Sequence, residues 1–395
     1  MRKSVLSLAV LAPVLLLADA WRPSEFEIRG WNHAVPLTEA SDKLFSPIGF
    51  AISVAMLGEG TGGNHRANIA EALGLLSDFG NAFSYVFKSY AEASASNAVN
   101  ITFAPSLWTR QRKKLDLDYR HSLQRNFEAE TGSLINEEPI NAWTEAKTDG
   151  RIAAIIDKVN PRTDVLLLNA IAFEGAWAKG FDPDRSVSET FTREDGSTTK
   201  LTMMHGELQE VVRVKNDHVT AIRVPFAAAG MSMLYLLPPA GTPIRDLRDN
   251  LTRKIPIDEL KSLFRAKSGA EVDVLPLKVA LPRMENLSRW ELLSSLAVFK
   301  VPVSGYQRIG EDFKINEVVQ AAYIKIVETG YSLTPGVTPP PPPKQDRRRS
   351  WREREEDEER QAMPRESFIL NRPFLYFVWD EKSDTLLLAG QFMGR

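Results

Sequence analysis

The spacing of apolar residues is helical in the first part of the chain. Small and apolar residues recur at helical intervals over residues 48–57 and again over 67–76, with a glycine-rich turn between them. This pattern predicts two packed helices. A further amphipathic helix is predicted within residues 141–159, where Gly150 breaks or bends it.

Downstream of this helix the apolar pattern becomes that of strands. The nearly continuous apolar run 165–173 is typical of a strand that is covered on both faces. Two hairpins and two further strands are predicted, at residues 219–226 with 231–237, 374–379 with 385–389, 272–281 and 321–327. The mixture predicts an α+β fold with largely antiparallel sheets.

The composition changes abruptly between residues 331 and 366. Prolines stand at position 335 and at 339–343, and a charged tract follows that is basic first and acidic later. A segment with almost no apolar residue besides Trp351 cannot bury enough surface to offset its ordering entropy. Because strand patterns resume on both sides, we expect a mobile, exposed loop inserted within the fold.

The first twenty residues have the pattern of a secretory signal. Arg2 and Lys3 precede an apolar stretch at residues 5–17, and Ala18-Asp19-Ala20 offers a small-x-small cleavage site. No later segment approaches about 18 consecutive apolar residues, so a membrane anchor is the less favoured interpretation. We therefore expect a secreted, extracellular protein that begins near Trp21 and has no membrane association.

Overall composition bears on the class of partner and on how the fold is stabilised. The 395 residues carry a formal net charge of -2, which gives no bias toward nucleic acid, and they include no cysteine, so stability must come from packing. Three Asn-x-Ser/Thr sequons, at Asn100, Asn250 and Asn286, are candidate glycosylation sites in a secreted protein. Asn100 is the weakest of them, because it opens a strand-like run.

Sequence motifs for catalysis or cofactor binding are weak. Gly58, Gly60 and Gly63 match a dinucleotide-binding spacing, but the run before them is helical where that motif needs a strand. The five histidines are scattered, with no paired spacing for a metal, and no nucleophile elbow or phosphate-binding loop occurs. We therefore expect no enzyme, no cofactor and no metal site.

Six segments, in order along most of the chain, resemble the serpin family. They are LFSPIGFAISVAMLGEGTGGNHRANIAEALGL, INAWTEAKTDGRIAAIID, LLLNAIAFEGAWAKGF, Met203-Met204, VVQAAYIKIVETG and NRPFLYFVWDEKSDTLLLAGQF. The resemblance implies a single domain over residues 21–395, with three β-sheets, about nine helices and an exposed reactive-centre loop. In inhibitory members the loop is cleaved by a serine protease and then enters the large sheet as a new central strand.

The resemblance also implies roles for particular residues. Ser46, Asn169 and Trp177 match positions that control the opening of the main sheet in the family. Two further positions depart from the family pattern, because Gly49 replaces a serine and Gln320 replaces a histidine. Opening of the sheet is then regulated differently or is not required.

The hinge of the predicted loop also departs from the inhibitory pattern. Glu328, Thr329 and Gly330 resemble the start of the family hinge, but bulky Tyr331 and Leu333 follow where small residues enter a sheet easily. Proline lacks the amide donor of a central strand, so Pro335 and the prolines at 339–343 oppose insertion. Family spacing places the cleavable bond at Lys344–Gln345, and cleavage after Arg347, Arg348 or Arg349 would lengthen the tether.

Two functions remain open. The first is a non-inhibitory or weakly inhibitory serpin whose loop is protease bait or a recognition arm; the second is a suicide inhibitor of a trypsin-like serine protease, cleaved at Lys344 or at one of the three arginines. The basic cluster could also bind a glycosaminoglycan, although the acidic residues beside it oppose this. We expect a monomer.

Overall fold

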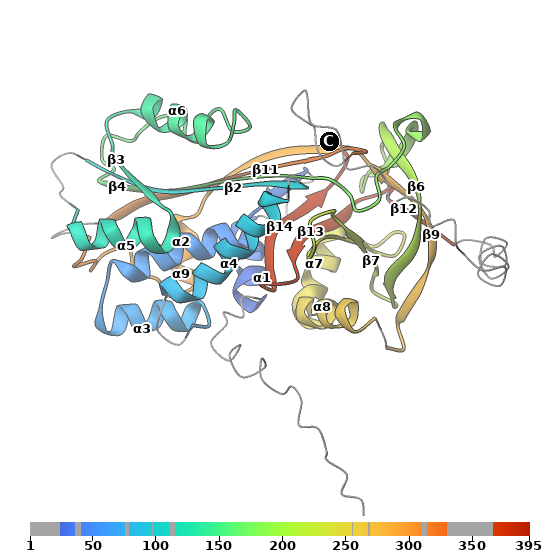
Figure 1. Ribbon diagram of the computed structural model, residues 1–395, viewed down its shortest axis with the longest axis horizontal. Coiled ribbons are helices and arrows are strands. Elements are labelled where there is room, and N and C mark those ends of the chain that lie inside the picture. The colour runs from blue at the N-terminus through green and yellow to red at the C-terminus, as the bar shows by residue number, and fades with distance from the viewer. Residues whose placement is uncertain are drawn as a thin grey trace, which may run out of the picture.

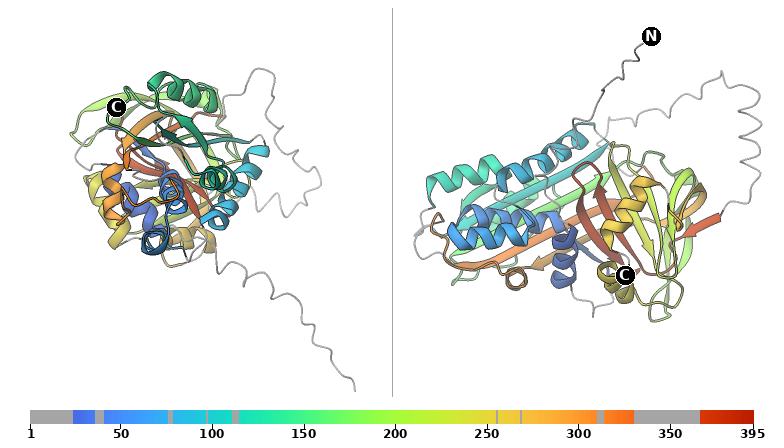
Figure 2. Two further views of the ribbon diagram at one scale, coloured as in Figure 1. Left: turned by 90° about the vertical axis from the view of Figure 1, so that its left-hand side faces the viewer. Right: turned by 90° about the horizontal axis from the view of Figure 1, so that it is seen from below.

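The computed structural model describes residues 24–35, 41–75, 79–96, 98–110, 115–254, 256–267, 269–309, 314–329 and 366–395. The predicted signal segment 1–20 and residues 331–365 of the predicted loop lie outside these ranges. Helices α2 to α5 lie toward one end of the long axis, and strands β6, β9 and β12 lie toward the other (Figures 1 and 2).

The described residues form nine α-helices, as the family resemblance implied. They are α1 (Ser24–Ala34), α2 (Pro47–Glu59), α3 (Gly63–Ala72), α4 (Phe79–Ala95), α5 (Leu117–Phe127), α6 (Glu137–Lys147), α7 (Ile244–Arg253), α8 (Ile257–Ala266) and α9 (Leu293–Val298). The two helices predicted from apolar spacing correspond to α2 and α3.

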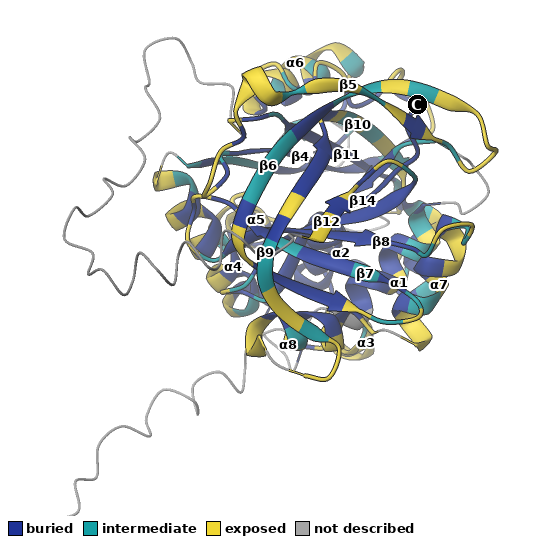
Figure 3. Ribbon diagram, turned by 90° about the vertical axis from the view of Figure 1, so that its right-hand side faces the viewer, coloured by how far each residue is buried: buried dark blue, intermediate teal, exposed yellow. Residues whose placement is uncertain are grey.

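A five-stranded sheet has the order β10-β11-β4-β2-β3. Its strands are β10 (Met284–Glu291), β11 (Ile315–Ile326), β4 (Val165–Gly175), β2 (Val99–Thr109) and β3 (Glu130–Ser133). The central neighbours β4 and β11 are parallel, whereas β10 with β11 and β2 with β4 are antiparallel. Every residue of β4 is buried, which confirms the predicted doubly covered strand (Figure 3).

The remaining strands form one continuous sheet of nine. They are β1 (Lys43–Phe45), β14 (Thr385–Phe392), β13 (Phe374–Asp380), β8 (Met231–Leu237), β7 (Thr220–Pro225), β6 (Thr198–Lys215), β9 (Val272–Pro282) and β12 (Glu366–Ile369), with β5 (Val187–Thr192) paired to β6. Both predicted hairpins are confirmed as β7–β8 and β13–β14. A third sheet is not separate in the hydrogen bonding of these residues, because β6 runs on past a register shift between Leu208 and Val211 and joins both halves.

The centre of the five-stranded sheet is buried on both faces. On one face, Leu167, Ile171 and Phe173 of β4 belong to the main core with α2, while α6 lies on the other side of the sheet (Figure 1). On that outer face Leu166 and Leu168 contact a second apolar cluster. Successive β4 side chains alternate between the two clusters, as strand geometry requires.

Helix α6 begins earlier and ends earlier than the predicted stretch 141–159. It ends at Lys147, and Asp149 and Gly150 both have positive φ, of 48° and 78°. The predicted break at Gly150 is therefore confirmed. Ile152, Ile155 and Ile156 follow outside the helix, yet they still pack on the outer face of the sheet.

A fully buried ion pair joins α1 to the β13–β14 turn and α8. Glu27 Oε1 accepts a hydrogen bond of 2.6 Å from the Leu386 amide, and Glu27 Oε2 lies 3.5 Å from Lys261 Nζ. Lys261 also donates to the Asp384 carbonyl at 2.9 Å. Burial raises the pKa of Glu27 to about 7, although the charge of Lys261 and the Leu386 amide oppose the rise.

We expect this carboxyl group to make stability depend on pH. Because the folded pKa of Glu27 lies above its ordinary value, its contribution is fully present below about pH 4.5 and is lost as the pH rises through about 7. The free energy of unfolding should therefore fall by about 2–3 kcal/mol across this window relative to Glu27→Gln. Denaturant titrations of both proteins from pH 5 to pH 8 measure it, and equal slopes would contradict the expectation.

Candidate functional site

The site begins at the seam between β4 and β11, the two parallel strands at the centre of the five-stranded sheet. They are paired from Val165 opposite Ile315 to Glu174 opposite Lys325, with one irregularity between Ile315 and Glu317. Pairing along the whole length means that no third strand lies between them. A segment running opposite to both would make antiparallel ladders with each, which is the geometry that a new central strand requires.

Ser46 caps the helix that approaches this seam from the core side. Its hydroxyl accepts a hydrogen bond of 3.1 Å from the Gly49 amide at the start of α2, and donates one of 2.7 Å to the Leu387 carbonyl of β14. The cap satisfies an amide that the first helical turn leaves without an intrahelical partner. Because Ser46 is fully buried, these bonds fix the first turn of α2 against the nine-stranded sheet.

Two side-chain amides then tie the same helical turn to the two strands of the seam. Gln320 of β11 accepts a hydrogen bond of 2.8 Å from the Ser46 amide and donates one of 2.9 Å to the Ser46 carbonyl. Asn169 of β4 donates a bond of 2.7 Å to the Gly49 carbonyl. Asn169 and Gln320 stand directly opposite each other in the strand register, so separating β4 from β11 would disturb at least one of these ties.

The two departures from the family pattern are structurally linked. A Cβ atom at Gly49 would lie 3.0 Å from Gln320 Nε2 and only 2.6 Å from Ile171 Cδ1. The missing side chain at position 49 therefore leaves the space that the glutamine amide uses. Sequence reasoning identified both positions but not their dependence on each other, because residues 271 apart in the chain carry no local signal of contact.

Trp177 lies at the C-terminal end of the seam, just beyond the last residues of β4 and β11. Its ring stacks on Phe226, with centroids 4.8 Å apart and planes 9° apart, and it meets Phe181 edge-on at 5.9 Å. The indole Nε1 donates a hydrogen bond of 3.0 Å to the carbonyl of Val327, one residue beyond β11. The aromatic contacts hold the ring in place, so the indole fixes the point where the chain leaves the sheet.

Glu328 is clamped at the same point. Arg283 Nε donates to its carboxylate at 2.6 Å, Ser186 donates to the same oxygen, and the Phe181 amide donates to the Glu328 carbonyl at 2.9 Å. Although burial would raise the pKa of Glu328, the bonds from Arg283 and Ser186 hold it below its usual value. The carboxylate therefore stays ionised at neutral pH, and it anchors the start of the predicted hinge.

Of the other predicted loop positions, Thr329 belongs to the described residues and the rest do not. Thr329 is exposed and is the last described residue before the loop. The remaining hinge and cleavage candidates lie outside the described residues: Gly330, Tyr331, Leu333, Pro335, Lys344, Gln345, Arg347, Arg348 and Arg349. Their assignments stay predictions from sequence.

The three candidate glycosylation residues are all partly buried and lie on three different elements. Asn100 lies on β2, Asn250 on α7 and Asn286 on β10. Asn286 Oδ1 accepts a bond of 2.9 Å from Ser288, and its Nδ2 is buried without a hydrogen-bond partner. A glycan at Asn286 would need this side chain to turn outward, whereas Asn250 lies on a helix of mixed exposure. Glycosylation stays a prediction at each.

The comparison with known families decides the class of the protein. The family model described as serpin (serine protease inhibitor) matches residues 25–394. The chain belongs to the serpin family. Serpins are generally protease inhibitors rather than catalysts. The glycine cluster at 58–63 follows helix α2 and not the strand that a dinucleotide site needs.

Individual serpins resemble this one at low identity over most of their length. Human serpin I2 is 23% identical over 95% of this chain and 91% of its own. An uncharacterised serpin-like protein of Thermococcus kodakarensis is 24% identical over 88% of this chain and 80% of its own. The crystal structure of native protease nexin-1 with heparin has a TM-score of 0.77 at 21% identity, covering 94% of this chain and 98% of that chain. Within the described ranges of this serpin, no helix is long and apolar enough to cross a membrane.

Proposed function

We propose that this chain is a secreted serpin that is non-inhibitory or weakly inhibitory, and whose loop serves as protease bait or a recognition arm. The proposal rests mainly on the number of loop amides that could pair with β11, which is twelve residues long. A strand of that length starting after Glu328 would contain Pro335 and reach the proline run at 339–343. Each of these positions lacks the amide that a central ladder uses.

Bulk at the start of the loop adds a second obstacle. Both faces of the sheet are already filled, by the main core and by the cluster beneath α6. A segment entering between β4 and β11 must therefore place alternate side chains against packed surfaces on both sides. Tyr331 and Leu333 would force those surfaces apart where small residues would not.

A second function is also supported by a specific observation. The parallel seam can pair with an antiparallel strand, and Lys344 with Arg347, Arg348 and Arg349 offers bonds that a trypsin-like serine protease cleaves. The second candidate is therefore a suicide inhibitor of such a protease. For this mechanism the hinge clamp around Glu328 and the amide ties at Ser46 would both have to adjust during insertion.

Incubating the full-length secreted form with trypsin separates the two candidates. We expect cleavage at Lys344 or at Arg347–Arg349 with full recovery of protease activity, because a proline-rich tether cannot carry the protease along the sheet. Denaturing gel electrophoresis and an activity assay read the result. A variant with Lys344 and the three arginines replaced by glutamine is the control, and it should resist cleavage there.

A covalent serpin–protease band that survives denaturation would instead establish the inhibitor. The same preparation tests secretion, since the segment 1–20 should direct the protein into the culture medium and be absent from its N-terminus. We also place a glycosaminoglycan among the candidate partners, because a structural neighbour, protease nexin-1, was crystallised with heparin. The candidate contact is the basic cluster Arg347–Arg349.

A further inference from the structure

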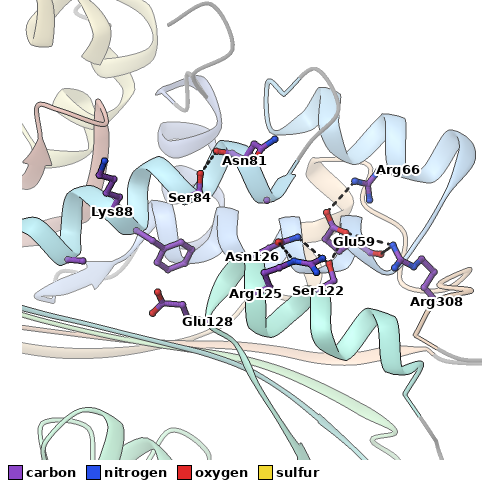
Figure 4. A pocket seen from close by; sticks show the side chains of 13 residues that line it. Glu59, Arg66, Asn81, Ser84, Lys88, Ser122, Arg125, Asn126, Glu128 and Arg308 are labelled. Carbon is purple, nitrogen blue, oxygen red and sulfur yellow. Dashed lines mark hydrogen bonds and ion pairs between the residues drawn. The ribbon is translucent and has the colours of Figure 1, made fainter. Parts of the chain in front are cut away.

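A cleft of about 850 Å³ opens where α4 and α5 meet the end of α2 (Figure 4). Its volume falls within the range of pockets that enclose small ligands. Four cationic and two acidic side chains line it: Arg66, Lys88, Arg125, Arg308, Glu59 and Glu128. The lining therefore carries a net formal charge of two positive units.

The acidic charge at the base of the cleft is already satisfied internally. Glu59, whose side chain is 7% exposed, lies 3.2 Å from Arg66 Nη2 and 3.8 Å from Arg308 Nη1. Ser122 of α5 donates a further bond of 3.1 Å to the same carboxylate. Figure 4 shows Glu59 between the two arginines, with the α5 side chains beside it. Glu59 is therefore neutralised and opposes an incoming anion little, and Glu128 is the second carboxylate of the lining.

Positive charge remains available around this point. Arg308 uses Nη1 to donate to the Glu59 carbonyl at 3.3 Å, and among the described residues its acidic partner is Glu59. Arg125 makes a long bond of 3.4 Å from Nε to Asn126, and it pairs with no carboxylate in the described ranges. Arg125 Nη1 and Nη2 are therefore left for a ligand. Guanidinium groups match the oxygens of phosphate in a two-bond geometry.

Arg66 and the backbone of Arg308 are held by the surrounding fold. Arg66 lies over the ring of Phe79 at 4.6 Å and donates to the Gly58 carbonyl at 3.0 Å. The backbone of Arg308 is fixed by a bond of 3.1 Å to the Gly60 carbonyl. Positioned charged groups lose little entropy when a ligand binds, which favours affinity.

We propose that this cleft binds a phosphate dianion, either as the free ion or as a phosphomonoester, between Arg125 and Arg308. Two negative charges balance the net charge of the lining, and the arginine donors supply the hydrogen bonds. Phe87, which also lines the cleft, offers an apolar surface to the organic part of an ester. The proposal does not depend on whether the loop inserts.

Isothermal titration calorimetry of the full-length protein tests the site with two probes, inorganic phosphate and phenyl phosphate. We expect saturable binding, and at least a tenfold loss of affinity in an Arg125→Gln, Arg308→Gln double variant, since each residue contributes charge-assisted bonds. Tighter binding of phenyl phosphate would identify an ester as the ligand, and equal binding would identify phosphate itself. Arg245→Gln is the matched control, because Arg245 is an exposed arginine on α7.

Three results would overturn the proposal. They are the absence of saturable binding of either probe, equal affinity in the wild type and the double variant, and binding of long heparin chains alone. The last result would indicate an extended surface for polyanions instead of a site for a single small anion. Thermal unfolding of the double variant must match that of the wild type within a few degrees. If it does not, the single variant Arg125→Gln keeps the test valid, because the Arg125 side chain makes only one long bond to the described residues.

Discussion

Gln320→Leu should lower the free energy of unfolding by about 1.5–4.5 kcal/mol. The substitution leaves the fully buried Ser46 amide without its partner, which costs about 1–3 kcal/mol, and it removes one hydrogen bond of about 0.5–1.5 kcal/mol from the Ser46 carbonyl, which still accepts from the Phe50 amide. It also releases β11 from the first turn of α2. Urea unfolding of the two proteins measures the difference.

Gln124→Leu provides the control for this prediction, because Gln124 is an exposed residue on α5. Its effect should stay within about 0.5 kcal/mol. If Gln320→Leu were equally mild, the amide would not be holding the helix to the strand. A double-mutant cycle extends the test, since Gly49→Ser should cost at least about 0.5 kcal/mol less when Gln320 is replaced by alanine. Additive costs would show that the two positions are independent.

A loop freed of its obstacles should enter the seam after cleavage. We expect a variant with alanine at Pro335 and at positions 339–343, and with Tyr331→Thr and Leu333→Ala, to gain on the order of 10 °C or more in Tm when its loop is nicked. A new central strand would add about ten ladder hydrogen bonds at roughly 1 kcal/mol each, and this gain would exceed the ordering cost only if the amides are present. Differential scanning calorimetry before and after trypsin treatment measures the shift.

A second variant, which carries Tyr331→Thr and Leu333→Ala but keeps the natural prolines, separates the effect of side-chain bulk from that of proline. If Tyr331→Thr and Leu333→Ala alone allowed the Tm to rise, bulk and not proline would be the barrier. If neither variant responded to nicking, the hinge clamp at Glu328 would become the main restraint, and Arg283→Ala would be the next substitution to test.

Much of the fold follows from local patterns in the sequence. Alternation and continuous apolar runs located β4, β7, β8, β13 and β14, because such patterns record which faces of a strand are buried. The end of α6 and the fusion of the expected sheets were harder. The first depends on positive φ at Asp149, and the second on a register shift in β6, and neither leaves a clear periodic signal.

The site was predictable only as a set of positions. The family resemblance pointed to Ser46, Asn169, Trp177 and Glu328. In the structure, Ser46 and Asn169 meet at the first turn of α2, and Trp177 and Glu328 lie where β11 ends. The resemblance did not indicate that the Gln320 side chain forms hydrogen bonds with the Ser46 backbone. Long-range polar contacts of this kind depend on the separation of two distant atoms, which composition and spacing do not record. The Arg283 clamp and the buried Glu27–Lys261 pair were missed for the same reason.

Thermal unfolding of the wild-type protein, intact and nicked at the trypsin-sensitive bonds, tests most directly whether the natural loop can become a strand between β4 and β11. An unchanged Tm after nicking is the predicted result, because the prolines lack the amides that would form hydrogen bonds with β4 and β11. A rise on the order of 10 °C would mean that the strand had formed, and the protein would then have the structural capacity of an inhibitor.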